Sequence, residues 1–254
     1  MANQTAAPYT PCWTELAVPD PEAAKAFYGA VFGWTGETDT RPEAGGYTVF
    51  KLGAEPVAAV LPLPEQGQPA AWNVCLAVED AAAVAAKVEQ NGGRILTAPD
   101  ADMLDLGRYG VLADPAGAAF AIWQPKSFPG SRIIGEENAL GWIELATSDP
   151  QRSLAFYPAV FGWATHLSDV YTEWSLDGAH FGGMSDLNQM PEGGGVARWM
   201  PYFRVEDVVD VAEKAGGAGA TVVVPPADVP GGDVRVSVLK DPQGAEFGLF
   251  APAG

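Results

Sequence analysis

The chain is poor in the residues that build metal sites and disulfide frameworks. Its 254 residues include only two cysteines, Cys12 and Cys75, and two histidines, His166 and His180. The cysteines lie far apart and outside any CxxC motif, which argues against a disulfide framework or a zinc knuckle. We therefore expect reduced thiols.

Basic side chains are also scarce. Fourteen Lys and Arg stand against 32 Asp and Glu, which gives a formal net charge of −18. Such a charge repels phosphate backbones and anionic lipid surfaces, so we expect neither nucleic acid nor membrane as a partner. An acidic surface mainly confers solubility, and it also favours a cationic small molecule over an anionic one.

Long hydrophobic runs are missing. No segment approaches the roughly 18 to 20 continuous apolar residues of a membrane span. The start, MANQTAAPYT, lacks the basic and apolar regions of a signal peptide. These features predict a cytoplasmic protein.

The sequence does contain an internal repeat. Residues 13–34 read WTELAVPDPEAAKAFYGAVFGW and residues 142–163 read WIELATSDPQRSLAFYPAVFGW, with fourteen of 22 positions identical. In the first copy WTELAV alternates like a strand, with Leu16 and Val18 on one face and Trp13 and Glu15 on the other. Asp20 is then the expected N-cap of a helix that ends at Gly33.

Each copy continues into a second, weaker strand-and-helix unit. WNVCLAVED at 72–80 precedes the helix AAAVAAKVEQ, and RYGVLADPAGAAFAIWQ at 108–124 supplies two strands around a turn. WMPYFRVEDVVDVAEKAGG and KDPQGAEFGLF repeat this layout in the second half. The chain therefore contains four modules, and self-similarity of this kind is stronger evidence than any single motif.

The module resembles that of the vicinal oxygen chelate superfamily, which includes glyoxalase I, extradiol dioxygenases and bleomycin-resistance proteins. W-x-E-L, F-Y-x-x-x-F-G-W and D-P-x-G carry the resemblance, from about residue 10 to 251. It implies an α+β fold of four βαβββ modules in two tandem glyoxalase-like domains with cupped mixed β-sheets. We place these domains at 8–128 and 136–252, joined by a linker at 129–135. Four modules in one chain suit a monomer, with a homodimer as the alternative.

The resemblance also implies where a metal would be held in members that bind one: near the start of each first strand and in each last strand. Those positions fall on Trp13, Asn73, Ala58 or Ala59, and Ala121 in the first repeat. In the second they fall on Trp142, Met200, Gly182 or Gly183, and Gly248. Such side chains do not hold a divalent ion. We interpret His180, close to Gly182, as a surface or packing residue, and expect neither metal nor cofactor.

With Trp, Ala, Gly and Met at these positions, we predict that the concave side of the sheet, the cup, is roomier and less polar and binds a small hydrophobic molecule. By strand alternation the residues that face it in the first repeat are Trp13, Glu15, Asn73, Cys75, Ala121 and Trp123. In the second repeat they are Trp142, Glu144, Met200, Tyr202, Arg204, Glu246, Gly248 and Phe250. The alternative is that these aromatic side chains fill a cup as its core. The second repeat has the richer polar set and is our first choice for the site.

The repeated glutamates, Glu15 and Glu144, allow two interpretations. Each is a ligand hydrogen-bond acceptor or general base, with Tyr202 as a further catalytic candidate. Alternatively each accepts hydrogen bonds where the two repeats meet, with Arg204 as a partner. Because both copies keep the residue, we favour the structural interpretation.

Three functions remain. The first is metal-independent sequestration of an aromatic antibiotic or biosynthetic product, which is similar to bleomycin resistance. The second is a metal-free enzyme or accessory protein of secondary metabolism that uses a carboxylate for proton transfer. The third is a glyoxalase-type metal-dependent lyase or dioxygenase, which the residues above disfavour. A purely structural role is the remaining alternative.

Overall fold

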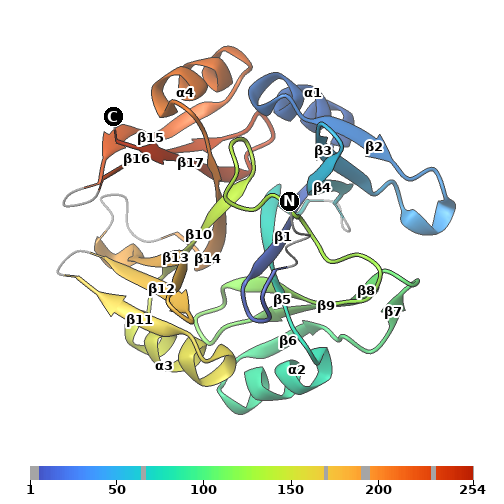
Figure 1. Ribbon diagram of the computed structural model, residues 1–254, viewed down its shortest axis with the longest axis vertical. Coiled ribbons are helices and arrows are strands. Elements are labelled where there is room, and N and C mark those ends of the chain that lie inside the picture. Colours follow the sequence, from blue (N-terminus) through green and yellow to red (C-terminus); the bar gives the residue numbers. More distant parts are fainter. Residues whose placement is uncertain (1–5, 64–66, 169–170, 190–194, 230–232, 254) are drawn as a thin grey trace. The chain divides into compact units, whose positions relative to one another are not determined.

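The computed structural model describes residues 6–63, 67–168, 171–189, 195–229 and 233–253. Four consecutive modules, each of a strand, a helix and further strands, make up this part of the chain (Figure 1). The α+β fold class predicted from the sequence is confirmed. No helix of the described residues is long and apolar enough to cross a membrane.

The first two modules follow the predicted order. The first contains β1 (Pro11–Val18), α1 (Pro21–Phe32), β2 (Thr35–Thr38), a short 3-10 turn (Pro42–Ala44), β3 (Thr48–Leu52) and β4 (Glu55–Pro62). The second contains β5 (Ala71–Ala77), α2 (Ala81–Gln90), β6 (Arg94–Thr97), β7 (Asp102–Met103), β8 (Gly107–Ala113) and β9 (Ala119–Pro125).

The last two modules repeat this layout. The third contains β10 (Leu140–Thr147), α3 (Pro150–Phe161), β11 (Ala164–Leu167), β12 (Thr172–Leu176), β13 (Ala179–Asp186) and a 3-10 turn (Leu187–Gln189). The fourth contains β14 (Arg198–Arg204), α4 (Val208–Gly217), β15 (Thr221–Asp228), β16 (Val234–Lys240) and β17 (Glu246–Pro252).

The helix ends follow from local chemistry in the repeated phrase. The Asp20 side chain accepts hydrogen bonds from the backbone N–H groups of Glu22 and Ala23, and Pro21 occupies the first turn. Gly33 then ends α1 with a φ of 74°, which a residue with a Cβ adopts only at a cost. Gly162 ends α3 with the same φ of 74°. These local signals confirm the predicted cap and stop.

The strands form two mixed sheets. The first has the order β2-β3-β4-β1-β5-β9-β8-β6, with β7 paired to β8, and the second has the order β11-β12-β13-β10-β14-β17-β16-β15. Each module's first strand runs parallel to its last strand, as in β1 with β4 and β10 with β13. All four modules therefore share one pairing of first and last strands.

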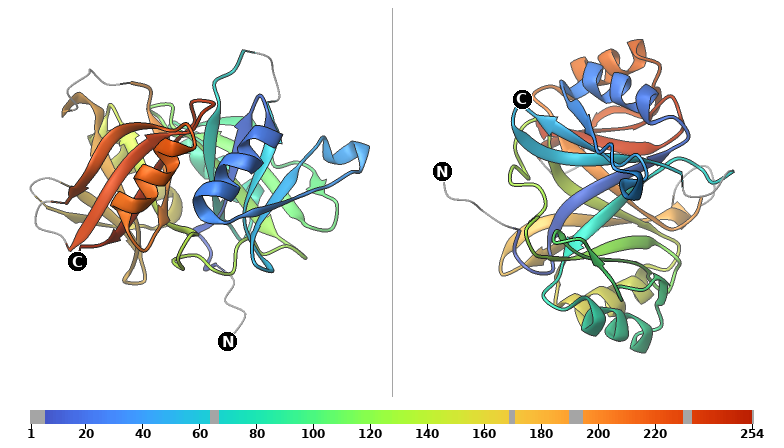
Figure 2. Two further views of the ribbon diagram at one scale, coloured as in Figure 1. Left: turned by 90° about the horizontal axis from the view of Figure 1, so that it is seen from above. Right: turned by 90° about the vertical axis from the view of Figure 1, so that its right-hand side faces the viewer.

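The chain also divides into two compact units that do not follow sequence order. The first unit consists of Met1–Cys12, Val74–Gly130 and Trp142–Met200, and the second of Trp13–Asn73, Ser131–Gly141 and Pro201–Gly254. Helices α2 and α3 belong to the first unit, and α1 and α4 to the second, where they lie side by side (Figure 2). The domain boundaries predicted from the sequence are repeat boundaries, and they stay a prediction.

The same hydrogen-bond chain stabilises the core of both units. In the second unit Trp72 Nε1 donates to Tyr28 Oη at 3.0 Å, and Tyr28 donates to Asp241 at 3.0 Å. In the first unit Trp199, Tyr157 and Asp114 form the equivalent bonds at 2.9 and 3.1 Å. The tyrosines come from the F-Y of the repeated phrase and the aspartates from the D-P-x-G turns. The repeated segment, residues 13–34 and 142–163, occurs twice because each copy packs its helix onto the D-P-x-G turn of another module.

Candidate functional site

The repeated Trp and Glu of the second repeat meet a tyrosine that was not predicted. In the first unit Trp142 Nε1 donates to Tyr171 Oη at 3.1 Å, and Tyr171 donates to the carboxylate of Glu144. Ser185 in β13 also bonds to Glu144. Trp142 and Tyr171 are half-buried, so solvent reaches the outer part of this chain of bonds. We call the sheet surface that carries these residues the Glu144 face.

The first repeat contains the same three residue types in the second unit. Trp13 Nε1 donates to Tyr47 Oη at 3.1 Å, and Tyr47 donates to Glu15 at 2.6 Å. Here the exposure is reversed, because Trp13 is buried and Glu15 is only half-buried. The two copies thus share their bonds and differ in which end water reaches.

The carboxyl group of Glu144 has unusual electrostatics. Its side chain is buried, and the loss of hydration raises its pKa from 4.5 to about 7 despite the hydrogen bonds from Tyr171, Ser185 and Trp142. A carboxyl group with a pKa near 7 exists in both protonation states at neutral pH. It is therefore able to accept or release a proton there.

These contacts correct the expected partner of the two glutamates. We expected them to join the repeats, with Arg204 as a partner, yet each accepts a hydrogen bond from a tyrosine of its own module. Arg204 is exposed and donates from Nη1 to the carbonyl of Gly135 at 2.8 Å. The Tyr28–Asp241 and Tyr157–Asp114 pairs are among the contacts that do tie modules together.

Strand register decides which small residues oppose the glutamates. Glu15 is the Cα partner of Ala59, and Glu144 is the partner of Gly183. The other two last-strand positions are Ala121, opposite Cys75, and Gly248, opposite Tyr202.

The residues at the positions of a family metal do not fit a divalent ion. Such an ion requires several oxygen or nitrogen donors around one point. The positions are occupied by Trp13, Asn73, Ala59, Ala121, Trp142, Met200, Gly183 and Gly248, and only Asn73 carries a side-chain oxygen. Across the described ranges no group of three or more His, Cys, Asp or Glu is placed to hold a metal.

The glycines do not create the open volume that we expected. A Cβ at Gly183 would overlap the phenol of Tyr171, and one at Gly248 would overlap the ring of Tyr202. The rings therefore occupy the space that the missing side chains vacate. The prediction of a roomier cup was wrong at these two positions, because an aromatic ring lies against each bare backbone.

The other predicted residues differ in exposure. In the first unit Met200 and Trp123 are buried, and Trp123 Nε1 donates to Phe128 O at 2.8 Å. In the second unit Asn73, Tyr202, Glu246 and Phe250 are half-buried. Lys240 Nζ lies 3.3 Å from Glu246, and the Phe250 ring lies 2.6 Å from where a Cβ of Gly141 would be. Their role in binding stays a prediction.

Sequence reasoning missed Tyr47 and Tyr171, although a signal was present. Each tyrosine is followed by threonine at the start of its module's third strand, in GGYTVF and DVYTEW. The hydroxyl groups reach Glu15 and Glu144 only after the third strand pairs with the module's last strand, which itself lies beside the first. The recurrence of Y-T in both copies marks these tyrosines as candidates, and the structure supplies their partners.

Comparison with known proteins covers both repeats. A family model described as glyoxalase/bleomycin resistance protein/dioxygenase superfamily matches residues 11–122, and one described as glyoxalase-like domain matches residues 142–250. CFP32 of Mycobacterium tuberculosis, provisionally named a glyoxylase, is 39% identical over 96% of this chain and 95% of its own length. The anthracycline biosynthesis protein DnrV of Streptomyces peucetius is 36% identical over 96% and 93%.

Solved structures with the same fold are more distant in sequence. The Mn(II)-bound glyoxalase from Novosphingobium aromaticivorans superimposes with a TM-score of 0.69 at 18% identity, over 97% of this chain and 83% of that one. The 2,3-dioxygenase LapB from Pseudomonas sp. KL28 gives 0.69 at 17% identity, over 97% and 93%. At these identities the likeness concerns the fold alone.

Proposed function

Because the chain belongs to the glyoxalase/bleomycin resistance protein/dioxygenase superfamily, with two tandem glyoxalase-like domains, we propose that it binds a hydrophobic aromatic molecule without a divalent ion. The observation that carries the proposal is the chemistry of the Glu144 face. Trp142 and Gly183 occupy positions where a metal would need donor atoms. Beside them, Tyr171 offers an aromatic ring and Glu144 a carboxyl group. Aromatic walls with few polar groups are typical of sites for small organic ligands.

A fused-ring aromatic compound is the ligand class that we favour. DnrV, similar over nearly the whole chain, is named for anthracycline biosynthesis. Planar polycyclic molecules stack on exposed aromatic side chains, and Trp142 and Tyr171 are half-buried. An amino substituent on the ligand would suit the net charge of −18. The protein then acts on, carries or sequesters such a compound.

The test is a fluorescence titration of an anthracycline with the purified, metal-stripped protein. We expect saturable binding of one ligand per chain, at the Glu144 face. The affinity should be the same when EDTA is present. Trp142→Leu removes a ring from the face and should weaken binding by about tenfold or more. Trp13→Leu changes the equivalent position of the other copy and is the matched control. Binding that requires an added divalent ion would contradict the proposal.

A second function is favoured by one specific observation. The pKa of Glu144 is raised to about 7, so the same face suits proton transfer in a metal-free enzyme or accessory protein of secondary metabolism. Incubating bound ligand with the protein and analysing the mixture by mass spectrometry separates the two functions. Product formation that Glu144→Gln abolishes while binding persists supports catalysis. Unchanged ligand supports sequestration.

A further inference from the structure

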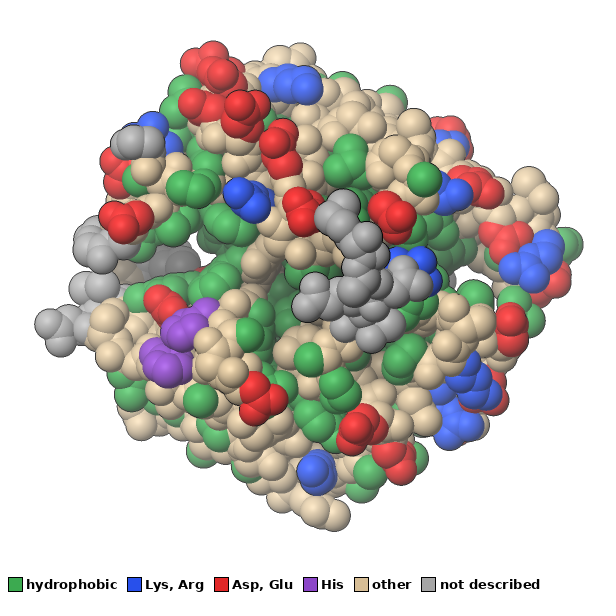
Figure 3. All heavy atoms as spheres, viewed as in Figure 1, with side chains coloured by type: hydrophobic (Ala, Val, Ile, Leu, Met, Phe, Trp, Pro, Cys, Tyr) green, Lys and Arg blue, Asp and Glu red, His purple; other side chains and the backbone are tan. Residues whose placement is uncertain are grey.

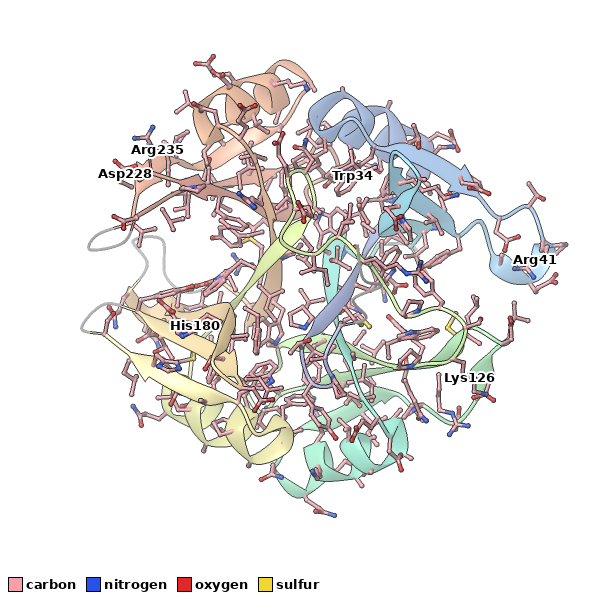
Figure 4. All side chains as sticks on the ribbon, viewed as in Figure 1. Trp34, Arg41, Lys126, His180, Asp228 and Arg235 are labelled. Atoms are coloured by element: carbon pink, nitrogen blue, oxygen red, sulfur yellow. The ribbon has the colours of Figure 1, made fainter. Side chains whose placement is uncertain are left out.

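The only two histidines of the chain meet on the third module. His166 in β11 and His180 in β13 come from strands on either side of β12, and their ring centroids lie 4.5 Å apart with planes tilted by 30°. Figure 3 shows them side by side at the surface, and Figure 4 labels His180. We expected His180 to be an isolated surface or packing residue. It is at the surface, but it belongs to a cluster.

Strand register places this cluster on the Glu144 face. Glu173 in β12 is the Cα partner of His166 on one side and of Gly183 on the other. Gly183 is in turn the partner of Glu144 in β10. Because directly paired residues project from the same side of a sheet, the cluster and Glu144 share one surface.

Trp174 follows Glu173 in β12 and projects from the opposite side of the sheet. Trp174 is fully buried against Tyr157 and Trp163 of the core. The histidines therefore face away from the core, on the surface that we propose binds the ligand.

Glu173 fixes which ring nitrogen of His180 is available. His180 Nδ1 lies 2.5 Å from Glu173 Oε2. An ionised carboxylate only accepts hydrogen bonds, so Nδ1 donates to Glu173 and Nε2 is the ring nitrogen left to a ligand. The side chains of His180 and Glu173 are 40% and 41% exposed, so a ligand can approach them. This carboxylate–imidazole pair is arranged as a proton acceptor.

His166 has a different role in the cluster. Its Nε2 lies 2.8 Å from Ser175 Oγ, and its ring stacks obliquely against that of His180. Ring-nitrogen lone pairs lie in the ring planes, and stacked planes do not direct them at one point. The arrangement therefore suits a flat support beside a proton acceptor better than a two-histidine metal site.

We infer that His180 is a second anchor of the Glu144 face and that the ligand is an aromatic compound with an acidic hydroxyl group. On binding, the O–H bond of the ligand breaks and its proton forms an N–H bond with His180 Nε2. The resulting phenolate oxygen accepts a charge-assisted hydrogen bond from the imidazolium, whose charge Glu173 stabilises. This inference rests on the proposed function and names the ligand class of the same face.

The experiment compares 2-hydroxyanthraquinone with 2-methoxyanthraquinone, two compounds with the same rings of which only the first ionises. With wild-type protein we expect the hydroxy compound to bind in its ionised form, seen by its absorption spectrum, at a pH where the free compound is neutral. It should bind about tenfold or more tightly than the methoxy compound. His180→Gln should bind both compounds equally, with no ionised spectrum. Glu173→Gln should reduce both effects.

His166→Gln is the matched control, because it changes the neighbouring histidine and leaves the His180–Glu173 pair intact. It should retain the ionised spectrum. If wild type binds both compounds equally, or if His180→Gln keeps the ionised spectrum, the inference is overturned while the proposed function stands. If neither compound binds, both fail. Circular dichroism of each variant establishes that a lost signal does not come from misfolding.

Discussion

At the scale of single residues, the two glutamates of the repeat have different environments. Glu144 is buried and has its pKa raised to about 7, whereas Glu15, which accepts the equivalent hydrogen bond from Tyr47, is half-buried. The last strands also differ beside the two glutamates. Ser185, the Cα partner of Ala146, hydrogen-bonds to Glu144 and opposes the rise in its pKa, whereas the partner of Ala17 is Leu61. The copies therefore share the hydrogen bond from tyrosine to glutamate, while the burial of the two carboxyl groups differs.

The first prediction concerns the pH dependence of stability. In the unfolded chain Glu144 loses its proton near pH 4.5, but in the folded protein it does so near pH 7. Its contribution to stability is therefore complete below pH 4.5 and is lost as pH rises to 7. The loss amounts to about 3 kcal/mol. Urea unfolding of Glu144→Gln between pH 4.5 and 8 should show a flatter profile than wild type.

The matched control for this experiment is Glu15→Gln, which changes the same position of the other copy. Asp114 and Asp241 also have pKa values raised by burial, so wild type retains a slope of the same sign from these groups. Only the difference between each variant and wild type is informative. Equal flattening by both substitutions would contradict the assignment to Glu144.

A second prediction concerns Gly183. Alanine there would overlap the Tyr171 phenol and displace it from Glu144, which leaves a buried carboxyl group with fewer hydrogen bonds. We expect Gly183→Ala to reduce the free energy of unfolding by about 1–3 kcal/mol. In a Tyr171→Ala background the same substitution should cost much less. A double-mutant cycle by chemical denaturation measures this coupling.

At the scale of elements, the helix-to-turn contacts determine how modules pair. Tyr157 of α3 donates to Asp114 of the turn between β8 and β9, and Asp114 also accepts the backbone N–H groups of Ala116 and Ala118. Burial raises the pKa of Asp114, and these hydrogen bonds oppose the shift. The turn and the helix are thus fixed by one carboxyl group.

The third prediction tests this contact. Tyr157→Phe deletes one hydroxyl group and leaves both Asp114 and the indole N–H of Trp199 without that partner in the core. We expect a loss of about 1–3 kcal/mol in the free energy of unfolding, measured with guanidinium chloride. Tyr28→Phe makes the equivalent change in the second unit and should cost a similar amount. A loss in one unit alone would show that the two contacts are not equivalent.

The β7–β8 hairpin supplies a fourth prediction. Leu104 at its tip has a φ of 54° and is 56% exposed, so it occupies a left-handed conformation without gaining much burial. Leu104→Asn should stabilise the protein by about 0.5–1 kcal/mol, because asparagine tolerates this conformation better than leucine. Thermal unfolding checks the direction. Leu106→Asn, at a neighbouring exposed residue without positive φ, should not stabilise it.

At the scale of the whole molecule, the compact units combine modules from both repeats. The first unit takes its helices from the second and third modules, and the second unit takes them from the first and fourth. Aromatic contacts within a unit therefore join distant parts of the chain, as when Tyr28 and Phe32 pack on Phe247. A cut between the repeats divides both units.

The fifth prediction follows from this division. Residues 1–130 and 131–254, expressed separately, each lack half of both aromatic cores. We expect neither half to be a folded monomer by size-exclusion chromatography and circular dichroism. Coexpression should restore a complex of wild-type size, because the missing core surfaces are then supplied in trans. Two separately folded, non-associating halves would contradict this expectation.

The sequence by itself determined the repeat, the four modules, the helix caps and the family. These features depend on local chemistry and strand periodicity, which are encoded in consecutive residues such as Asp20, Pro21 and Gly33. The tertiary structure alone decided which residues meet. Tyr171 reaches Glu144, Tyr28 reaches Asp241, and His180 joins His166 and Glu173 only through strand register and module pairing. Such contacts depend on long-range packing, so no spacing along the chain specifies them.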